Sequence, residues 1–527
     1  MKLFSRPYKL VGLLVTALAI SFIYWDSLSL KANSLSNGAS YEPVKCWFAN
    51  NSKVKTECGY MTTRKDSESG ASFKLPVVIL RNSHWKNSAT PMLHISGGPG
   101  GSAYIDAETM PYWLKNFQTQ NWGVDFVLYD QRGTGLGQPF LDCPDSHQTR
   151  LDSLQKPLSS SQDAAHFIKQ MNECHLQLSE ESPFSNHMSA ISTNHSTDDI
   201  ADLHDLLKVN QWILMGVSYG TRLALNVVKR FPEKVHSMVL DSVYPPEFDG
   251  FETMIENGFK GIERLLDSCE KDMLCDGDFP DLSEQLRQAL FQLVKSPLKL
   301  TVSREGSKLA KETILLSAHR LILLLDYASY DSRLLQEIPA AIIAVLDKDN
   351  SDKSLLKLAS NYLDIELFVQ FSEPVFMLTE CKENGHFDMD SLLERLQPYI
   401  EEYPMLDWSS EGIFNPLICK NWLTGVSDSS ERYRQSVTTD KPTLILNGGL
   451  DSITPPEWGR YLSKRLPNSR YFEYPNVGHS VLTSSLCAND EVQVFLNPQT
   501  SKTSFCNTKQ RSLELSGEAI NWAAVIN

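Results

Sequence analysis

The stretch from Trp212 to Leu225, WILMGVSYGTRLAL, constrains the fold more than any other part of the 527-residue chain. It places Ser218 between two glycines, after the apolar run 212–215 and before apolar residues at helical spacing. A tight turn between a buried strand and a helix would raise the serine hydroxyl above the end of that strand. A G-x-S-x-G pattern arises by chance in roughly one such chain in ten. The motif alone therefore leaves a nucleophile and an ordinary turn serine both open.

Alternation of apolar runs with helical patterns predicts an α/β fold with a mostly parallel sheet and helices on both faces. The expected strands cover residues 75–80, 91–95, 124–129, 212–215, 235–240, 443–446 and 471–474, whereas 41–65 is polar and predicts irregular structure. Long amphipathic runs at 262–270, 282–294, 309–325 and 334–346 predict helices instead. We therefore expect a core formed by residues 41–246 and 441–527, interrupted by a mainly helical insert at 247–440.

The charge balance restricts the partners. The chain has 49 Lys and Arg against 64 Asp and Glu, a formal net charge of −15. Such a chain is poorly suited to bind nucleic acid or anionic lipid headgroups. Small or cationic partners are easier to accommodate.

Residues 1–30 have the layout of a secretion signal, because basic residues precede the apolar run 10–25 and a Ser/Leu/Asn-rich stretch follows it. The run is short for a spanning helix, which needs about 20 apolar residues. The best cleavage site, Ser27-Leu28-Ser29, is also poor. A cleaved signal peptide and an uncleaved N-terminal membrane anchor therefore both stay open. In either case we expect the catalytic part outside the cytoplasm, either periplasmic or secreted, or held at a membrane.

The ten cysteines of an exported chain favour disulfide bonds over metal ligands. None forms a C-x-x-C pair, and they fall along the chain as neighbouring couples. Local pairing would staple loops, and it predicts these bonds: Cys46–Cys58, Cys143–Cys174, Cys269–Cys275, Cys381–Cys419 and Cys487–Cys506. We expect no metal and no cofactor.

A reactive serine needs a base and a carboxylate on loops at the carboxyl ends of sheet strands. Asp451 and His479 stand on such loops, after the last two predicted strands. Asp241, at the end of the strand that follows Ser218, is a rival for the carboxylate. Asp451 is preferred because its loop lies nearer the usual position of that residue. We predict a triad of Ser218, Asp451 and His479.

An acyl-transfer site also needs two N–H groups aimed at the developing oxyanion. One should be the N–H of Tyr219, directly after the serine. The other should come from the loop SGGPGGS, residues 96–102, whose glycines allow close backbone approach. Pro99 has no N–H, so Gly98 is the predicted second donor, although the loop could also be only a flexible turn.

The segments HISGGPGGS, LYDQRGTG, MGVSYGTRLAL, LNGGLDSITP and NVGHS, in this order, resemble the proline iminopeptidase and tripeptidyl aminopeptidase family of serine peptidases. The resemblance implies an α/β-hydrolase fold with a helical cap, no metal, and release of N-terminal residues or short peptides. Iminopeptidases often have histidine before the two glycines, where this chain has Ser96. This departure and the long insert resemble the tripeptidyl branch more closely.

The expected function is an exported serine aminopeptidase that acts on peptides with a free N-terminus. An esterase or lipase with the same triad, and an inactive hydrolase-like binding protein, are the alternatives. A carboxylate in the insert should bind the substrate ammonium. Glu380 and Glu383, which flank Cys381, are the candidates, and the alternative for both is a solvated surface position.

Overall fold

The structure is a computed structural model that describes residues 30–82, 90–180, 184–303, 311–384, 389–408, 418–422 and 434–497. The predicted leader, apart from Leu30, and Cys506 lie outside the described residues. Within the described ranges, no helix has both the length and the apolar character needed to cross a membrane.

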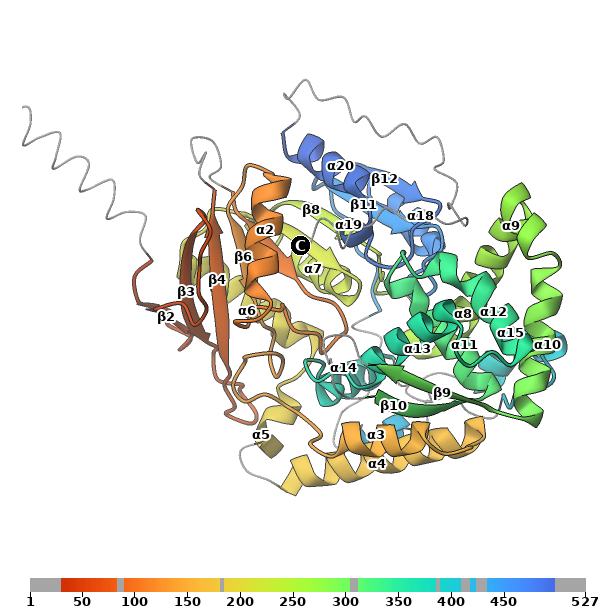
Figure 1. Cartoon of the computed structure of the whole chain (residues 1–527). Helices are drawn as coiled ribbons and strands as arrows, with labels where there is room; N and C mark the ends of the chain where they lie inside the picture. Colours follow the sequence, from red (N-terminus) through yellow and green to blue (C-terminus); the bar gives the residue numbers. More distant parts are fainter. Residues whose placement is uncertain are drawn as a thin grey trace, which may run out of the picture.

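The described chain forms one ten-stranded sheet, seen in Figure 1. Its strands lie in the order β1 (Asn33–Ser34), β2 (Ser40–Val44), β3 (Lys55–Thr62), β4 (Lys74–Arg81), β6 (Phe126–Tyr129), β5 (Met92–Ile95), β7 (Trp212–Val217), β8 (Val235–Asp241), β11 (Thr443–Gly448) and β12 (Ser469–Tyr474). From β6 to β12 all neighbours are parallel, whereas β1 to β4 extend the sheet antiparallel. The mostly parallel α/β sheet predicted from the sequence is confirmed.

Residues 41–65 were expected to be irregular, and this expectation is wrong for β2 and β3. β3 pairs with β4 along its whole length, with Cys58 opposite Val78. Tyr41, Cys58 and Met61 point into the core, while polar residues of the same strands face outward. β2 becomes a strand by pairing with β3, and β3 by pairing with β2 and β4, and local sequence did not reveal these backbone partners.

Alternate residues of the strands feed two separate apolar layers, as the pleat requires. Val77 and Ile79 belong to one layer, whereas Val78 and Leu80 belong to the other. The first layer is covered by α6 (Thr193–Leu207), α7 (Tyr219–Arg230) and α18 (Pro456–Ser463), and the second by α2 (Met110–Gln120), α19 (Val481–Ser484) and α20 (Leu486–Leu496). Both faces of the parallel sheet are therefore buried.

The cap insert has an apolar core of its own and lies beside the sheet, drawn green to cyan in Figure 1. Its elements are α8 (Gly250–Glu270), α9 (Met273–Asp278), α10 (Leu282–Lys295), β9 (Leu298–Ser303), β10 (Lys311–Leu316), α11 (Ala318–Tyr327), η2 (Ala328–Tyr330), η3 (Leu335–Glu337), α12 (Ile338–Asp347), α13 (Lys353–Glu366), α14 (Glu373–Asn384), α15 (Met389–Glu402) and α16 (Cys419–Trp422). The expected helix at 309–325 is partly wrong, because β10 pairs with β9 before α11 begins. The six residues of β10 are polar at 311–313 and apolar at 314–316, and so short a segment is compatible with either structure until a partner strand is known.

Helices α3 (Ser146–Leu154) and α4 (Ser160–Glu180) come before the Ser218 strand in sequence but pack against the cap. Arg320 of α11 is 1% exposed and bonds the carbonyl oxygen of Ser153 and the carboxylate of Asp163, both at 2.8 Å. Residues of α3 and α4, which the sequence assigned to the core, therefore pack with the cap. The boundaries at 246 and 440 stay a prediction.

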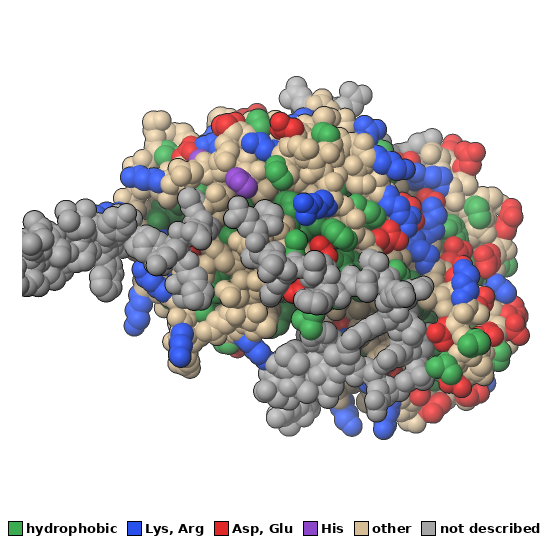
Figure 2. All heavy atoms as spheres, turned by 90° about the horizontal axis from the view of Figure 1, so that it is seen from above, with side chains coloured by type: hydrophobic (Ala, Val, Ile, Leu, Met, Phe, Trp, Pro, Cys, Tyr) green, Lys and Arg blue, Asp and Glu red, His purple; other side chains and the backbone are tan. Residues whose placement is uncertain are grey.

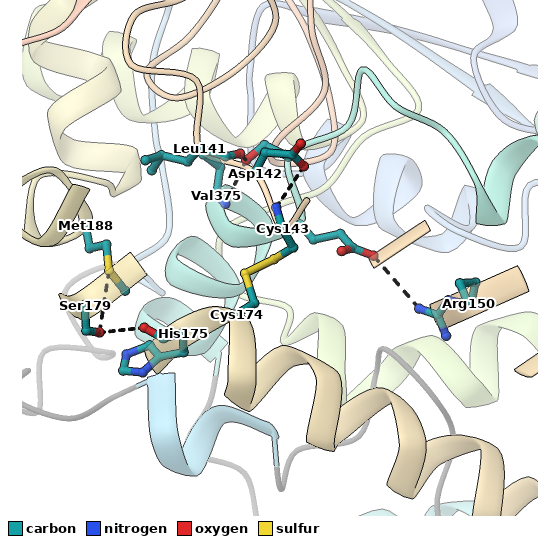
Figure 3. The surroundings of a disulfide bond; sticks show 11 residues. Leu141, Asp142, Cys143, Arg150, Cys174, His175, Ser179, Met188 and Val375 are labelled. Atoms are coloured by element: carbon teal, nitrogen blue, oxygen red, sulfur yellow. Dashed lines mark hydrogen bonds and ion pairs between the residues drawn. A yellow bond between two sulfur atoms is a disulfide. The ribbon is translucent and has the colours of Figure 1, made fainter. Parts of the chain in front are cut away.

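Disulfide bonds tie several of these segments together. Four of the five predicted pairs are present: Cys46–Cys58, Cys143–Cys174, Cys269–Cys275 and Cys381–Cys419. Figure 3 shows the second, which fastens the chain that follows β6 to α4. The partner predicted for Cys487 is outside the described residues.

Candidate active site

Ser218 lies at a sharp turn between β7 and α7, as predicted. Its backbone has φ +56° and ψ −126°, a conformation that costs about 1–3 kcal/mol for a residue other than glycine. The Ser218 N–H donates to the carbonyl oxygen of Asp241 at 3.0 Å, which helps to hold the turn. A Cβ on Gly220 would lie 2.1 Å from the carbonyl oxygen of Ile95, so only glycine fits there. The glycine after the serine is therefore required by the contact of α7 with β5.

The glycine loop that follows β5 lies against this turn. A Cβ on Gly97 would be 2.9 Å from the Cβ of Ser218, so the loop backbone contacts the serine side chain. Gly98, the predicted donor, has φ +114°, which favours glycine. The N–H of Tyr219 is the first of α7, where backbone donors have no partner within the helix. Sequence reasoning overlooked Gly97, although it belongs to the same SGGPGGS signal.

The cap also holds this glycine loop. The Ser372 N–H donates to the carbonyl oxygen of Gly100 at 2.9 Å, and Ser102 Oγ donates to Gln370 Oε1 at 3.2 Å. A short antiparallel bridge joins Gly101 to Phe371. The loop expected to bind the oxyanion is therefore braced by the segment that leads into α14.

His479 and Asp451 meet at the carboxyl end of the sheet. His479 Nδ1 lies 2.9 Å from Asp451 Oδ2 and 3.1 Å from Oδ1. The N–H groups of Ile453 and Thr454 donate to Asp451 Oδ1 at 2.9 and 2.8 Å, and Thr454 Oγ1 donates to Oδ2 at 2.8 Å. The carboxylate is thus fixed from its own loop and presents an acceptor to the imidazole. Thr454 was not singled out from sequence, because a threonine three residues after an aspartate is a common turn pattern.

The ionisation of this pair follows from burial and charge. Burial by itself would lower the pKa of His479, but the attraction and hydrogen bond of Asp451 outweigh it and raise that pKa above its usual value. Burial would likewise raise the pKa of Asp451, but His479 and the hydrogen bonds from Thr454 hold it below the usual value. The pair therefore favours an ionised carboxylate beside a basic imidazole.

Asp241, the rival carboxylate, has a different set of partners. Its two oxygens accept the N–H groups of Val481 and Leu482 at 2.8 and 2.9 Å. Burial raises its pKa to about 6. Asp241 thus fastens the chain directly after His479 and, through its carbonyl oxygen, the turn at Ser218. The structure brings Asp451, and not Asp241, to Nδ1 of the imidazole.

Glu380 and Glu383 are buried in α14, at 4% and 1% exposure, so a solvated surface position is wrong for both. Glu383 Oε1 accepts the N–H of Thr193 at 3.0 Å, and Oε2 lies 3.8 Å from Nε of Arg222. Arg222 lies one turn after Tyr219 on α7. Two carboxyl groups of the cap therefore lie close to the helix that begins at the Ser218 turn.

Glu380 has neutral hydrogen-bond partners. Its Oε2 accepts Nδ2 of Asn384 at 2.6 Å and the hydroxyl of Tyr244 at 3.4 Å. Burial raises the pKa of Glu380 to about 7, partly opposed by the charge of Arg222. Glu380 thus differs from Glu383, which already has a cationic partner within ion-pair distance.

The chain is similar to known hydrolases. The family described as alpha/beta hydrolase fold matches residues 90–269, and the family described as TAP-like protein matches residues 403–504. Serine protease Hip1 of Mycobacterium tuberculosis is 24% identical over 415 residues, which covers 76% of this chain and 77% of that protein. The tripeptidyl aminopeptidase of Streptomyces lividans is 27% identical over 201 residues, 37% of this chain and 36% of that protein. The probable proline iminopeptidase of Leptolyngbya boryana is 22% identical over 174 residues, 32% and 38% of the two chains.

Proposed function

Because the chain belongs to the α/β-hydrolase family of proline iminopeptidases and tripeptidyl aminopeptidases, we propose that it is an exported serine aminopeptidase. The observation that carries the proposal is the buried His479–Asp451 pair at the carboxyl end of the sheet, where β7 ends directly before Ser218. The four disulfide bonds support an oxidising compartment outside the cytoplasm.

In the proposed reaction, Ser218 Oγ attacks the carbonyl carbon of the scissile bond while His479 takes the hydroxyl proton. The N–H groups of Gly98 and Tyr219 stabilise the oxyanion that forms. His479 then gives its proton to the leaving amine, and the C–N bond breaks to leave an acyl-enzyme. A water molecule, deprotonated by the same imidazole, attacks the ester carbonyl; the bond between the acyl carbon and Ser218 Oγ breaks, His479 returns the proton to Oγ, and the N-terminal product leaves. Asp451 accepts a hydrogen bond from Nδ1 and so holds the imidazole in the tautomer that these proton transfers require.

Glu380 is the proposed ligand of the substrate ammonium. Glu383 already lies within ion-pair distance of Arg222. Glu380 accepts hydrogen bonds from neutral groups, so a bound peptide amino group would give it a directly bonded cation. An arriving ammonium would also favour the ionised form of its carboxyl, whose pKa is about 7. Figure 2 shows acidic side chains interspersed with Lys and Arg at the cap end of one face, and the formal net charge of −15 favours attraction of cationic peptides.

We expect tripeptidyl 4-nitroanilides with a free amino group to be cleaved far faster than their acetylated forms. Glu380→Gln should lower the ratio of kcat/KM for the free-amine substrate to kcat/KM for neutral 4-nitrophenyl acetate by about 10–100-fold, because a charge-assisted hydrogen bond is lost. Glu402→Gln, a half-exposed cap residue, is the matched control. Equal cleavage of acetylated and free-amine peptides by the unmodified protein would favour the esterase alternative instead.

The pH dependence follows from the raised pKa of His479. Only the neutral imidazole accepts the serine proton, so kcat/KM should fall as the pH drops through this pKa. Because the pKa is raised, the midpoint of the acid limb should lie above 6.5, the ordinary value for histidine. Initial rates between pH 5 and 9 measure it. A midpoint below 6, or a flat profile, would contradict the proposed base.

A further inference from the structure

A short cap segment, residues 326–332 at the end of α11 and in η2, lies directly on the loop that carries His479. The His479 N–H donates to the carbonyl oxygen of Ser329 at 2.7 Å, and the Gly478 N–H donates to Ser332 Oγ at 3.0 Å. The ring of Tyr330 meets the imidazole edge to face, with 5.1 Å between ring centroids. Both the backbone and the ring of His479 therefore contact the cap.

The same region of the cap contacts the loop that carries the carboxylate. Ser329 Oγ lies 2.8 Å from Oγ of Ser452, the residue after Asp451. Arg264 of α8 donates to the carbonyl oxygen of Asp451 at 2.7 Å. The cap thus holds both partners of the proposed triad through direct hydrogen bonds to their loops.

At two glycines the cap and the core approach each other closely. A Cβ on Gly478 would lie 2.2 Å from the carbonyl oxygen of Ser329. On the other side of the site, a Cβ on Gly100 would lie 2.5 Å from the carbonyl oxygen of Ser372. The cap therefore touches the histidine loop and the glycine loop at backbone distance.

We propose that cap segment 326–332 positions His479 for catalysis, so that the cap is a structural part of the catalytic centre as well as a cover for the substrate. The proposal rests on the proposed triad and goes beyond it, because it assigns a positioning role to cap residues that act through His479. It requires that weakening the contact between the cap segment and the histidine loop slows chemistry even for a substrate too small to need the cap.

The charge of Asp326 in this cap segment allows a second, independent test, because it affects the pKa of His479. Burial raises the pKa of Asp326 to about 6. Among the described residues Asp326 Oδ1 has no hydrogen-bond partner, while a side-chain hydrogen bond from Ser452 favours the ionised form of the carboxyl. Among the described residues, ionisable side chains from four elements lie around the imidazole: Asp451 after β11, Asp241 on β8, Asp326 on α11 and Tyr330 in η2. Of the carboxylates, Asp326 is the one supplied by the cap, and it raises the pKa of His479.

The first experiment measures hydrolysis of 4-nitrophenyl acetate, normalised to the folded fraction from a thermal melt. Ser332→Ala removes the acceptor of the Gly478 N–H and should lower kcat about tenfold with little change in KM. Gly478→Ala places a methyl group against the cap and should lower kcat about 100-fold, since displacements of about 1 Å have such effects. Ser354→Ala, a cap serine that bonds Glu337 away from the histidine loop, is the matched control and should leave kcat unchanged.

The second experiment measures the pH profile of the same reaction. Asp326→Asn should move the acid limb to lower pH by about half a unit or more, because a negative charge near the imidazole is lost. Glu337→Gln removes a negative charge elsewhere in the cap and should leave the midpoint in place. A change that only loosened the fold would alter the folded fraction without moving this midpoint.

Wild-type kcat for folded Ser332→Ala and an unmoved midpoint for Asp326→Asn would overturn the positioning role. A wild-type protein that hydrolyses the ester but no peptide would overturn the peptidase proposal alone, since both experiments use the ester. A wild-type protein inert toward the ester and toward peptides would overturn both proposals.

Discussion

Ser218→Ala should abolish turnover, with a loss on the order of 10⁶ in kcat, because the hydroxyl is the atom that forms the acyl-enzyme bond. The fold should survive. The serine side chain makes no capping hydrogen bond to α7, and alanine meets the same backbone conformation at φ +56°. Steady-state assays on tripeptidyl 4-nitroanilides and a thermal melt of the same sample measure the two quantities.

The control for this change is Ser237→Ala, which removes a buried serine hydroxyl from β8. It should retain wild-type kcat. Labelling with a fluorophosphonate should occur in the wild type and in Ser237→Ala, and be lost in Ser218→Ala. Activity near the wild-type level in Ser218→Ala would remove the nucleophile from the mechanism, and an unlabelled, inactive wild type would favour the inactive binding protein.

Asp451→Asn should lose about 10⁴ in kcat, because an amide at this position can donate to Nδ1 and so favours the wrong imidazole tautomer. The loss should be smaller than in Ser218→Ala or His479→Ala, since groups that act as a unit are not additive. Single-turnover rates on the alkaline plateau of each variant's own pH profile separate this effect from a shifted protonation of His479.

Asp241→Asn provides the comparison for the choice of carboxylate. Its amide nitrogen would face the N–H of Val481 or Leu482, so one buried acceptor becomes a donor. We expect a loss of stability of about 1–3 kcal/mol and a smaller change in kcat per folded molecule than in Asp451→Asn. A larger loss of kcat in Asp241→Asn would show that the choice of Asp451 is wrong.

The α/β order and the positions of Ser218, Asp451 and His479 could be predicted from sequence because their signals are local. Each residue follows a short apolar strand and stands beside glycines that permit a tight loop. Four disulfide pairs were also predictable, because neighbouring cysteines close short loops and need few long-range contacts. The carboxyl ends of parallel strands share one edge of a sheet, so local order was enough to predict that the three loops converge.

Only the tertiary structure decided which groups meet in the interior. Asp241 ends β8 and Asp451 follows β11, and their roles separate only because Asp451 reaches Nδ1 of His479 whereas Asp241 accepts the N–H groups of Val481 and Leu482. The strands β2 and β3 and the hairpin β9–β10 form because distant backbone completes their hydrogen bonds. In the same way, the burial of Glu380 beside Tyr244 and the contact of Ser329 with His479 join residues more than 100 positions apart, and no local pattern of side chains specifies such pairs.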